Sequence, residues 1–175
     1  MNKRWIPVVA IVVTVAGFTS ARAQEAAAAP KASGGASGFG YRGWGPRVGL
    51  GSDPDQLLVG VHWDLGEFAP QVAFRPDVVL GFGDDVTSLV GSAAVWYRFE
   101  GASSEVTPYA GGALAVGVFD VDNRGNDDDE SDVEIGLQAG GGGEWDLKSG
   151  NRFLAELRFD LGDVWEVAAF AGWTF

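Results

Sequence analysis

The sequence predicts an all-β protein, an eight-stranded antiparallel up-and-down β-barrel that crosses a membrane with its strands. Apolar and polar residues alternate with a period of two from Trp44 onward. Clusters of Gly, Asp, Asn, Ser and Pro interrupt this alternation at regular intervals, as turns do. Gly, Asp, Glu or Arg interrupts every apolar run after the first 23 residues, so no such run is long enough for a spanning helix. If the mature chain enters a membrane, it must do so as strands.

The alternation is clearest between residues 152 and 161. Phe153, Leu157 and Phe159 fall on one face of an extended chain, while Glu156 and Arg158 fall on the other. A helix would place these charges on several sides, whereas a strand segregates them. Eight segments of this kind are predicted, at 44–51, 56–66, 71–83, 87–100, 106–120, 133–147, 152–161 and 164–175.

Aromatic residues gather at one end of the predicted strands. A soluble sandwich or lipocalin-like barrel also alternates, but it has no reason to place its aromatics at strand ends. If the first strand starts in the periplasm, these residues form the aromatic girdle of a membrane interface: Trp44, Trp63, Tyr97, Phe99, Trp145, Phe153, Trp173 and Phe175. Phe82, Phe159 and Trp165 are expected to form a sparser belt at the opposite rim.

The other face of the strands carries charges of both signs. An apolar core could not satisfy them, but an ion-pair and hydrogen-bond network inside a closed barrel could. The residues predicted for this interior polar network are Arg47, His62, Asp64, Arg75, Asp77, Arg98, Glu144, Arg152, Glu156 and Arg158. Pro76 lies deepest among the strand prolines, so we expect a bulge or a late strand start there.

The N-terminus is predicted to be an export signal. Lys3 and Arg4 precede an apolar stretch, and Ala21-Arg22-Ala23 is a small-x-small cleavage site. The predicted organisation is a signal peptide at 1–23, a flexible periplasmic segment at 24–43 and the barrel at 44–175. The net charge of −12 makes nucleic acid an unsuitable partner, and the chain contains no cysteine for disulfides.

Several segments resemble one known family. They are Thr107-Pro108-Tyr109-Ala110-Gly111-Gly112, the stretch from Arg75-Pro76-Asp77 to Gly81-Phe82-Gly83, and the C-terminal Phe175 with Trp173 two residues before it. The chain resembles the small eight-stranded outer-membrane proteins of the OmpA and OmpX type. This resemblance implies a place in the cell outer membrane and an assembly signal at Trp173 and Phe175. It departs from the family where Phe170 stands near the position of a usual glycine.

The resemblance also implies the partners. They are outer-membrane lipids and lipopolysaccharide, with the barrel-assembly machinery and periplasmic chaperones acting during export. We expect a monomer without a cofactor and without nucleic acid. The fold itself says little about activity, because it carries channels, adhesins, lipid enzymes and structural proteins.

His62 is the single histidine, so every histidine-based mechanism has to use it. No second group suggests a Ser-His-Asp arrangement, and a hydrogen-bonding role beside Asp64 is favoured. The glycines at 140–143 lack the lysine and the helix of a phosphate loop. They are interpreted as close strand packing in a narrow barrel.

The acidic run at 120–132 has part of the pattern of a calcium loop. Asp120, Asp122 and Gly125 fit its first, third and sixth positions, but Arg124 and Ser131 occupy ligand positions. A solvated extracellular loop that binds divalent cations weakly is therefore favoured over a defined site. The weak metal candidates are Asp120, Asp122, Asp127 and Asp128.

The sequence favours a non-enzymatic outer-membrane protein with a structural or surface-interaction role. An eight-stranded barrel is just filled by its side chains, so an open pore is not expected. A narrow channel or transporter for small solutes is the alternative, although Trp96 and Phe170 are predicted to face inward. A lipid-modifying enzyme is a third hypothesis that rests on fold analogy alone.

Overall fold

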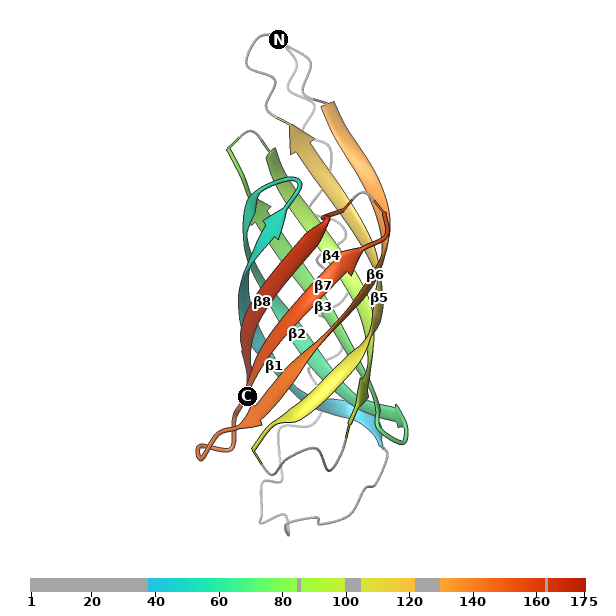
Figure 1. Cartoon of the computed structure of the whole chain (residues 1–175), viewed down its shortest axis with the longest axis vertical. Helices are drawn as coiled ribbons and strands as arrows, with labels where there is room; N and C mark the ends of the chain where they lie inside the picture. The colour runs from blue at the N-terminus through green and yellow to red at the C-terminus, as the bar shows by residue number, and fades with distance from the viewer. Residues whose placement is uncertain (1–37, 85, 100–104, 122–129, 163) are drawn as a thin grey trace, which may run out of the picture. The chain divides into compact units, whose positions relative to one another are not determined.

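Eight strands follow one another along the chain and close into a barrel (Figure 1). The structure is a computed structural model that describes residues 38–84, 86–99, 105–121, 130–162 and 164–175. The strands are β1 (Phe39–Ser52), β2 (Gln56–Ala69), β3 (Val72–Phe82), β4 (Val86–Arg98), β5 (Thr107–Val121), β6 (Glu130–Asp146), β7 (Arg152–Asp160) and β8 (Val167–Thr174). Every neighbouring pair is antiparallel, and β8 pairs with β1, which confirms the predicted fold class. The described residues contain no helix that is long and apolar enough to cross a membrane.

The stagger of the strands follows from their pairing. From Leu50, directly paired residues lead through β2, β3, β4 and β5 to Ser131 on β6. In the other direction they lead from Leu50 through β8 and β7 to Gly141 on the same strand. The two end points lie ten positions apart in the chain, and this offset is the shear of the barrel. Eight tilted strands with such a stagger enclose an interior that side chains can just fill.

Side chains alternate between the inside of the barrel and its outer wall. On β3, Arg75 and Asp77 are buried inside, whereas Leu80 lies on the wall and is 43 % exposed. Large apolar side chains on the wall of other strands are also exposed, among them Leu50 of β1 and Ile135 of β6, both at 66 %. A water-soluble protein rarely exposes so much contiguous apolar surface. The barrel wall is therefore apolar, and the charged residues lie inside.

The eight predicted girdle aromatics lie at one end of the barrel, where β1 begins and β8 ends. Several of them form ring pairs there. The ring centroids are 6.4 Å apart for Trp44 and Phe175 and 5.2 Å apart for Phe153 and Trp173. The aromatics thus form a nearly continuous belt around this end, which is called the girdle end below.

The first strand begins earlier than predicted. β1 starts at Phe39, inside the segment expected to be flexible, and Phe39 pairs with Gly66 of β2. Phe39 and Tyr41 point outward and extend the aromatic belt. The predicted start was wrong because Phe39 and Tyr41 are separated by glycine and followed by a single arginine. This alternation of apolar and polar residues is too short to be recognised as a strand. The signal peptide and residues 24–37 lie outside the described residues.

Trp165 corrects the predicted belt at the opposite rim. β8 begins at Val167, not at residue 164, and Trp165 lies in the connection after β7 with only 1 % of its surface exposed. The connection bends into the mouth of the barrel, where the Trp165 indole N–H donates to Gln56 Oε1 at 3.0 Å. The alternation of β8 does not continue through this bend, so the predicted outward orientation was wrong.

The irregularity expected near Pro76 lies on the neighbouring strand. β3 starts four residues before Pro76, and its pairing with β4 is regular, with Pro76 opposite Ala93. The ladder to β2 shifts between His62 and Glu67, which are the β2 residues facing this part of β3. β2 therefore has one extra residue in the part that faces Pro76, which has no N–H to donate to the ladder.

Candidate functional site in the barrel interior

The ten residues predicted for the interior polar network all point into the barrel. Their strands place them at alternate positions facing the axis. Arg98 and Arg152 are partly exposed at the girdle end, and the other eight are buried: Arg47, His62, Asp64, Arg75, Asp77, Glu144, Glu156 and Arg158. The structure brings them into two linked groups of ion pairs.

The first group is a ring of four charges at the middle of the barrel, called the central ring. Arg47 bonds Asp77 Oδ2 and Glu156 Oε1, both at 2.7 Å. Arg158 bonds the same two carboxylates, at 2.5 Å to Asp77 and 2.7 Å to Glu156. Each arginine therefore bridges both acids, and the ring is electrically neutral.

The second group repeats this arrangement closer to the girdle end and is called the lower ring. Arg98 lies 3.3 Å from Asp64 and 3.3 Å from Glu144. Arg152 pairs with Asp64 and lies 3.4 Å from Glu144. Two arginines again share two carboxylates, and these four residues come from β2, β4, β6 and β7.

Arg75 of β3 joins the two rings. It pairs with Glu144 of the lower ring and lies 3.9 Å from Glu156 of the central ring. Tyr109 strengthens the junction, since its hydroxyl donates to Glu156 Oε2 at 2.9 Å. Buried charges are tolerated when they are paired and hydrogen-bonded in this way. The network thus links strands from all sides of the barrel across its interior.

Some buried polar atoms of the interior have no hydrogen-bond partner among the described residues. They include Arg75 Nε, Ser92 Oγ and Trp96 Nε1. Ordered water commonly satisfies isolated buried groups of this kind.

His62 is buried inside the barrel, where its hydrogen-bond partner is a threonine of β8. Its Nε2 lies 2.8 Å from Thr174 Oγ1 of β8, and no hydrogen bond joins it to Asp64. Nδ1 of His62 has no partner among the described residues, so no carboxylate orients the ring as in a catalytic triad. Both side chains are buried, and the pair serves to join β2 to β8.

Three polar contributors were missed by the sequence analysis: Tyr109, Gln138 and Thr174. Gln138 accepts from Arg158 at 3.2 Å and donates to Asp160 at 3.1 Å. All three occupy inward positions of their strands, so the phase of the alternation was the signal that could have found them. The predicted network contained only charged residues and the histidine.

An apolar layer fills the other half of the interior, on the side away from the girdle end. Its members come from five strands and from the connection that holds Trp165: Leu58, Val79, Val90, Ala115, Phe119, Val164, Trp165, Ala168 and Phe170. The guanidinium of Arg47 lies 4.0 Å from the centre of the Phe170 ring, so the apolar layer rests directly on the central ring. The apolar layer and the central ring therefore adjoin inside the barrel.

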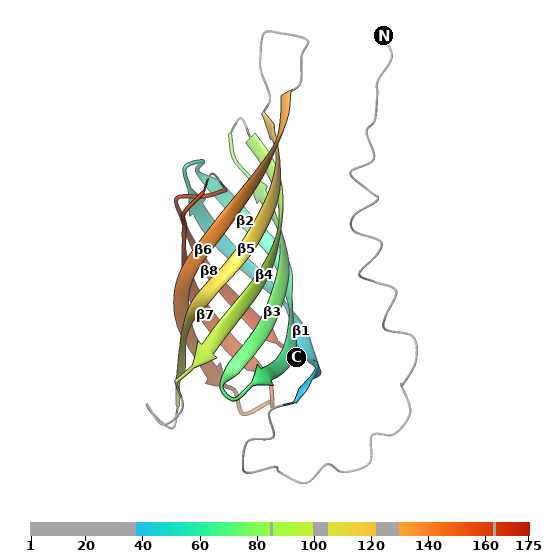
Figure 2. The same cartoon turned by 90° about the vertical axis from the view of Figure 1, so that its right-hand side faces the viewer.

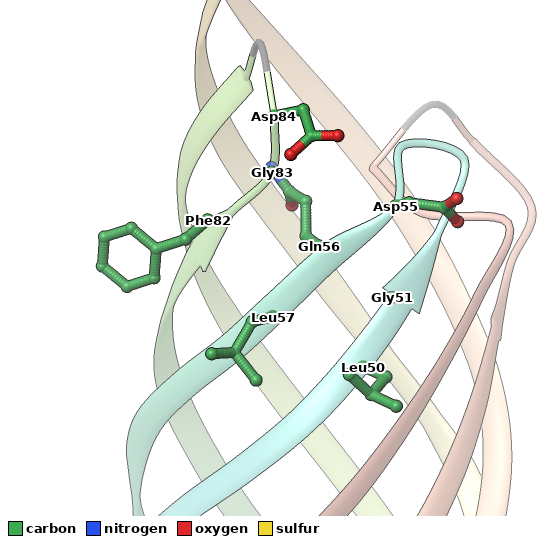
Figure 3. A pocket seen from close by; sticks show the side chains of 8 residues that line it. All are labelled: Leu50, Gly51, Asp55, Gln56, Leu57, Phe82, Gly83 and Asp84. Atoms are coloured by element: carbon green, nitrogen blue, oxygen red, sulfur yellow. The ribbon is translucent and has the colours of Figure 1, made fainter.

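A shallow depression lies on the outer wall near the rim, between β1, β2 and β3 (Figure 3). Leu50, Leu57 and Phe82 point away from the wall there, and Asp55 and Asp84 lie at its upper border. Gln56 also lines it, but its side chain bonds Trp165 and Ser88. Among its lining residues there is no pairing of a nucleophile with a base, so this depression has no features of an active site.

The acidic run is only partly described. Asp120 is exposed at the end of β5, whereas Asp122, Asp127 and Asp128 lie outside the described residues. Within the described ranges, no group of three or more His, Cys, Asp or Glu side chains is arranged to hold a metal ion.

The glycines at 140–143 occupy close-packed positions on β6. A Cβ added at Gly142 would meet the Tyr109 hydroxyl at 2.8 Å. The absence of a side chain therefore lets Tyr109 reach Glu156, and a phosphate-binding role has no support in this geometry.

Solved structures with a similar architecture include two bacterial outer-membrane barrels. Neisserial surface protein A (NspA) is 18 % identical, with a TM-score of 0.56, and the match covers 77 % of this chain and 94 % of that one. The N-terminal β-barrel domain of Pseudomonas aeruginosa OprF is 17 % identical, with a TM-score of 0.60, and the match covers 76 % and 96 %. No protein-family model and no curated protein matches the sequence. The chain has the fold of the small eight-stranded outer-membrane β-barrels.

Proposed function

We propose that this protein is an integral outer-membrane barrel that acts as a structural or surface-interaction element and conducts no solutes. The filled interior is the observation that carries the proposal. Two neutral rings of ion pairs occupy one half, and an apolar layer with Trp165 and Phe170 occupies the other. A conducting barrel needs a continuous hydrated path, and the apolar layer interrupts it.

The outer wall supports the proposed place in the outer membrane. Exposed apolar side chains cover it, and an aromatic belt marks one end, as expected at a membrane interface. We place the girdle end at the periplasm and the apolar layer towards the outside. In this orientation the lipids and lipopolysaccharide of the outer membrane contact the wall, and the barrel-assembly machinery inserts the chain as a monomer after cleavage of the export signal.

The interior also supports a non-enzymatic role. His62 is buried against Thr174, without a carboxylate on its second nitrogen. The carboxylates of both rings are held by arginines, which leaves them unsuited to act as acids or bases towards a lipid. We expect a His62→Gln variant to leave the lipid composition of the outer membrane unchanged.

Membrane fractionation and conductance test the proposal. The protein should fractionate with outer membranes and migrate differently in boiled and unboiled samples, because a closed barrel has no open end from which unfolding starts easily. Purified, refolded protein in planar bilayers should show no current steps above the lipid background. Regular single-channel steps would contradict the filled interior and favour the narrow channel, and identical migration before and after boiling would contradict the closed barrel.

A further inference from the structure

Trp165 enters the barrel from outside the strands. β7 ends at Asp160 and β8 begins at Val167, and the connection between them crosses the end of the barrel opposite the girdle (Figures 1 and 2). Backbone bonds hold this connection, because the Asp160 N–H donates to the Glu166 carbonyl at 3.2 Å and the Glu166 N–H donates to the Ser52 carbonyl at 3.0 Å. The side chain of Trp165, one residue earlier, is only 1 % exposed. It therefore fills the mouth of the barrel without belonging to the sheet.

The surroundings of the indole have the composition of a small-molecule pocket. The apolar layer encloses the ring, and Phe170 packs edge-on against it with the ring centroids 6.2 Å apart. Gly51 gives room on β1, because a Cβ at this position would meet Trp165 Cδ1 at 3.2 Å. A polar group also reaches in, since Gln56 Oε1 accepts from the indole N–H at 3.0 Å. Apolar walls with a few placed polar groups are typical of ligand pockets, and we call this place the Trp165 site.

The acceptor of the Trp165 site is oriented by other parts of the chain. Ser88 Oγ donates to Gln56 Oε1 at 2.9 Å, and Gln56 Nε2 donates to the Val86 carbonyl at 3.4 Å. Both of these partners belong to β4, so neither bond depends on the connection that carries Trp165. Gln56 is therefore expected to keep its orientation when the indole leaves. An acceptor that is positioned in advance lowers the cost of binding a donor.

The depression on the outer wall reaches the same residues. Gly51 and Gln56, which contact the indole from the inside, also line the depression (Figure 3). Gly83 lies beside Gln56 in this depression and has no side chain that could cover it; a Cβ there would meet Gln56 Cγ at 3.3 Å. Gly51 and Gln56 thus lie between the depression and Trp165. A small molecule at the rim has a route towards the Trp165 site along these residues.

We propose that the Trp165 site binds a small planar aromatic molecule with one N–H donor, and that the chain's own indole fills the site when no such molecule is bound. The molecule would take the place of the Trp165 ring against Phe170 and donate its N–H to Gln56 Oε1, while Trp165 turns out to water. Aromatic pairs add to the energy of apolar burial, so an aliphatic molecule of equal size fits less well. The tethered indole is an internal competitor with a high effective concentration. This inference adds a ligand to the structural role proposed above.

The first test observes Trp165 directly, with indole as the probe. Refolded full-length protein labelled with 5-fluorotryptophan is studied by fluorine NMR in lipid nanodiscs, and the Trp165→Phe variant assigns the resonance of Trp165. Addition of indole should shift this resonance saturably towards that of a tryptophan in water and make it sensitive to deuterium oxide. Trp96 is the internal control, because it is buried as deeply but packs on Tyr109 outside the Trp165 site. Its resonance should stay unchanged.

Variants test the competitor and the acceptor. Trp165→Ala removes the tethered ring and should bind indole at least tenfold more tightly than the wild type, with Trp165→Phe, which has a ring but no N–H, between the two. 1-Methylindole lacks the N–H and should bind to Trp165→Ala about three- to tenfold more weakly than indole, the effect of one hydrogen bond. Adding Gln56→Met to this variant should abolish that difference. Trp145→Ala, which removes a tryptophan of the girdle, is the matched control and should bind indole like the wild type.

The outcomes are distinguishable from those of the proposed function. An unchanged Trp165 resonance at the solubility limit of indole would overturn the inference, and so would equal shifts of Trp165 and Trp96, which would indicate a general effect of indole on the membrane. Equal affinity of Trp165→Ala for indole and 1-methylindole would reject Gln56 as the acceptor. The central ring lies below the site and stays in place, so planar bilayers should show no current steps with or without indole. Such steps would contradict the structural role without changing the result of the indole titration.

Discussion

Trp165 and Gln56 meet across the mouth of the barrel, where the indole N–H of Trp165 donates to Gln56 Oε1 at 3.0 Å. This bond ties the connection between β7 and β8 to the first residue of β2. Gln56 Oε1 also accepts from Ser88 at 2.9 Å, so one amide oxygen joins three distant parts of the chain. Trp165, which belongs to no strand, is therefore the part of the apolar layer that closes the mouth of the barrel.

Replacement of Trp165 by alanine should destabilise the barrel by about 3–5 kcal/mol, because a large buried ring is lost and leaves a cavity. The measurement is the midpoint of urea unfolding in lipid vesicles, followed by the shift in heat-modifiable migration. Leu161→Ala is the control, since Leu161 lies in the same connection but is 74 % exposed. Equal midpoints for the two variants would show that Trp165 does not hold the mouth closed.

Glu156→Gln should be among the most damaging single changes in the interior. Glu156 accepts from Arg47, Arg158 and Tyr109, so its neutralisation leaves the two arginines with only Asp77 to share. Removal of one partner of a buried ion pair lowers the free energy of unfolding by about 3–5 kcal/mol. Unfolding by urea measures the loss, with Glu166→Gln as the exposed control.

A second change tests whether charge balance is the cause. In the double variant Glu156→Gln with Arg158→Gln, one charge of each sign is removed from the central ring. Part of the lost stability should return, because residues of one network couple strongly. Strict additivity of the two single effects would argue against a coupled ring.

Gly142→Ala should destabilise the barrel, whereas Gly91→Ala should have little effect. An added Cβ at Gly142 meets the backbone carbonyl oxygen of Ala155 at 2.0 Å and the Tyr109 hydroxyl at 2.8 Å, so it would push β7 away and displace Tyr109 from Glu156. An added Cβ at Gly91 meets nothing within 4 Å. Overpacking of this kind costs about 1–3 kcal/mol. Comparable unfolding midpoints for the two variants would contradict the packing described for β6.

Deletion of residues 173–175 should block assembly in the outer membrane. Phe175 donates its N–H to the Trp44 carbonyl at 2.9 Å, and Trp173 packs on Phe153, so these residues complete the contact between the two ends of the barrel sheet. The amount of heat-modifiable protein in outer-membrane fractions measures assembly. Phe99→Ala, which removes another girdle aromatic away from the C-terminus, should assemble normally. Normal assembly of the deletion variant would reject both the closing role and the proposed assembly signal.

The sequence by itself determined the class of the fold and which residues of each strand face the interior. Period-two alternation is a local property, so it predicted that Arg47, Arg75, Asp77 and Glu156 share the inner face and that the aromatics share one end. Strand number followed from turn residues, which also act locally. Where alternation was short, as at Phe39 and Tyr41, the prediction missed the start of β1.

Only the tertiary structure decided which inner residues meet. Register and shear bring Arg47 of β1 to Glu156 of β7, 109 residues away, and bring His62 of β2 to Thr174 of β8. The same shear leaves the upper part of β6 without a described neighbour on one side, and a bend after β7 turns Trp165 inward. These features depend on how the closed sheet is staggered, and no local pattern encodes that stagger, because alternation is unchanged when a strand slides by two residues.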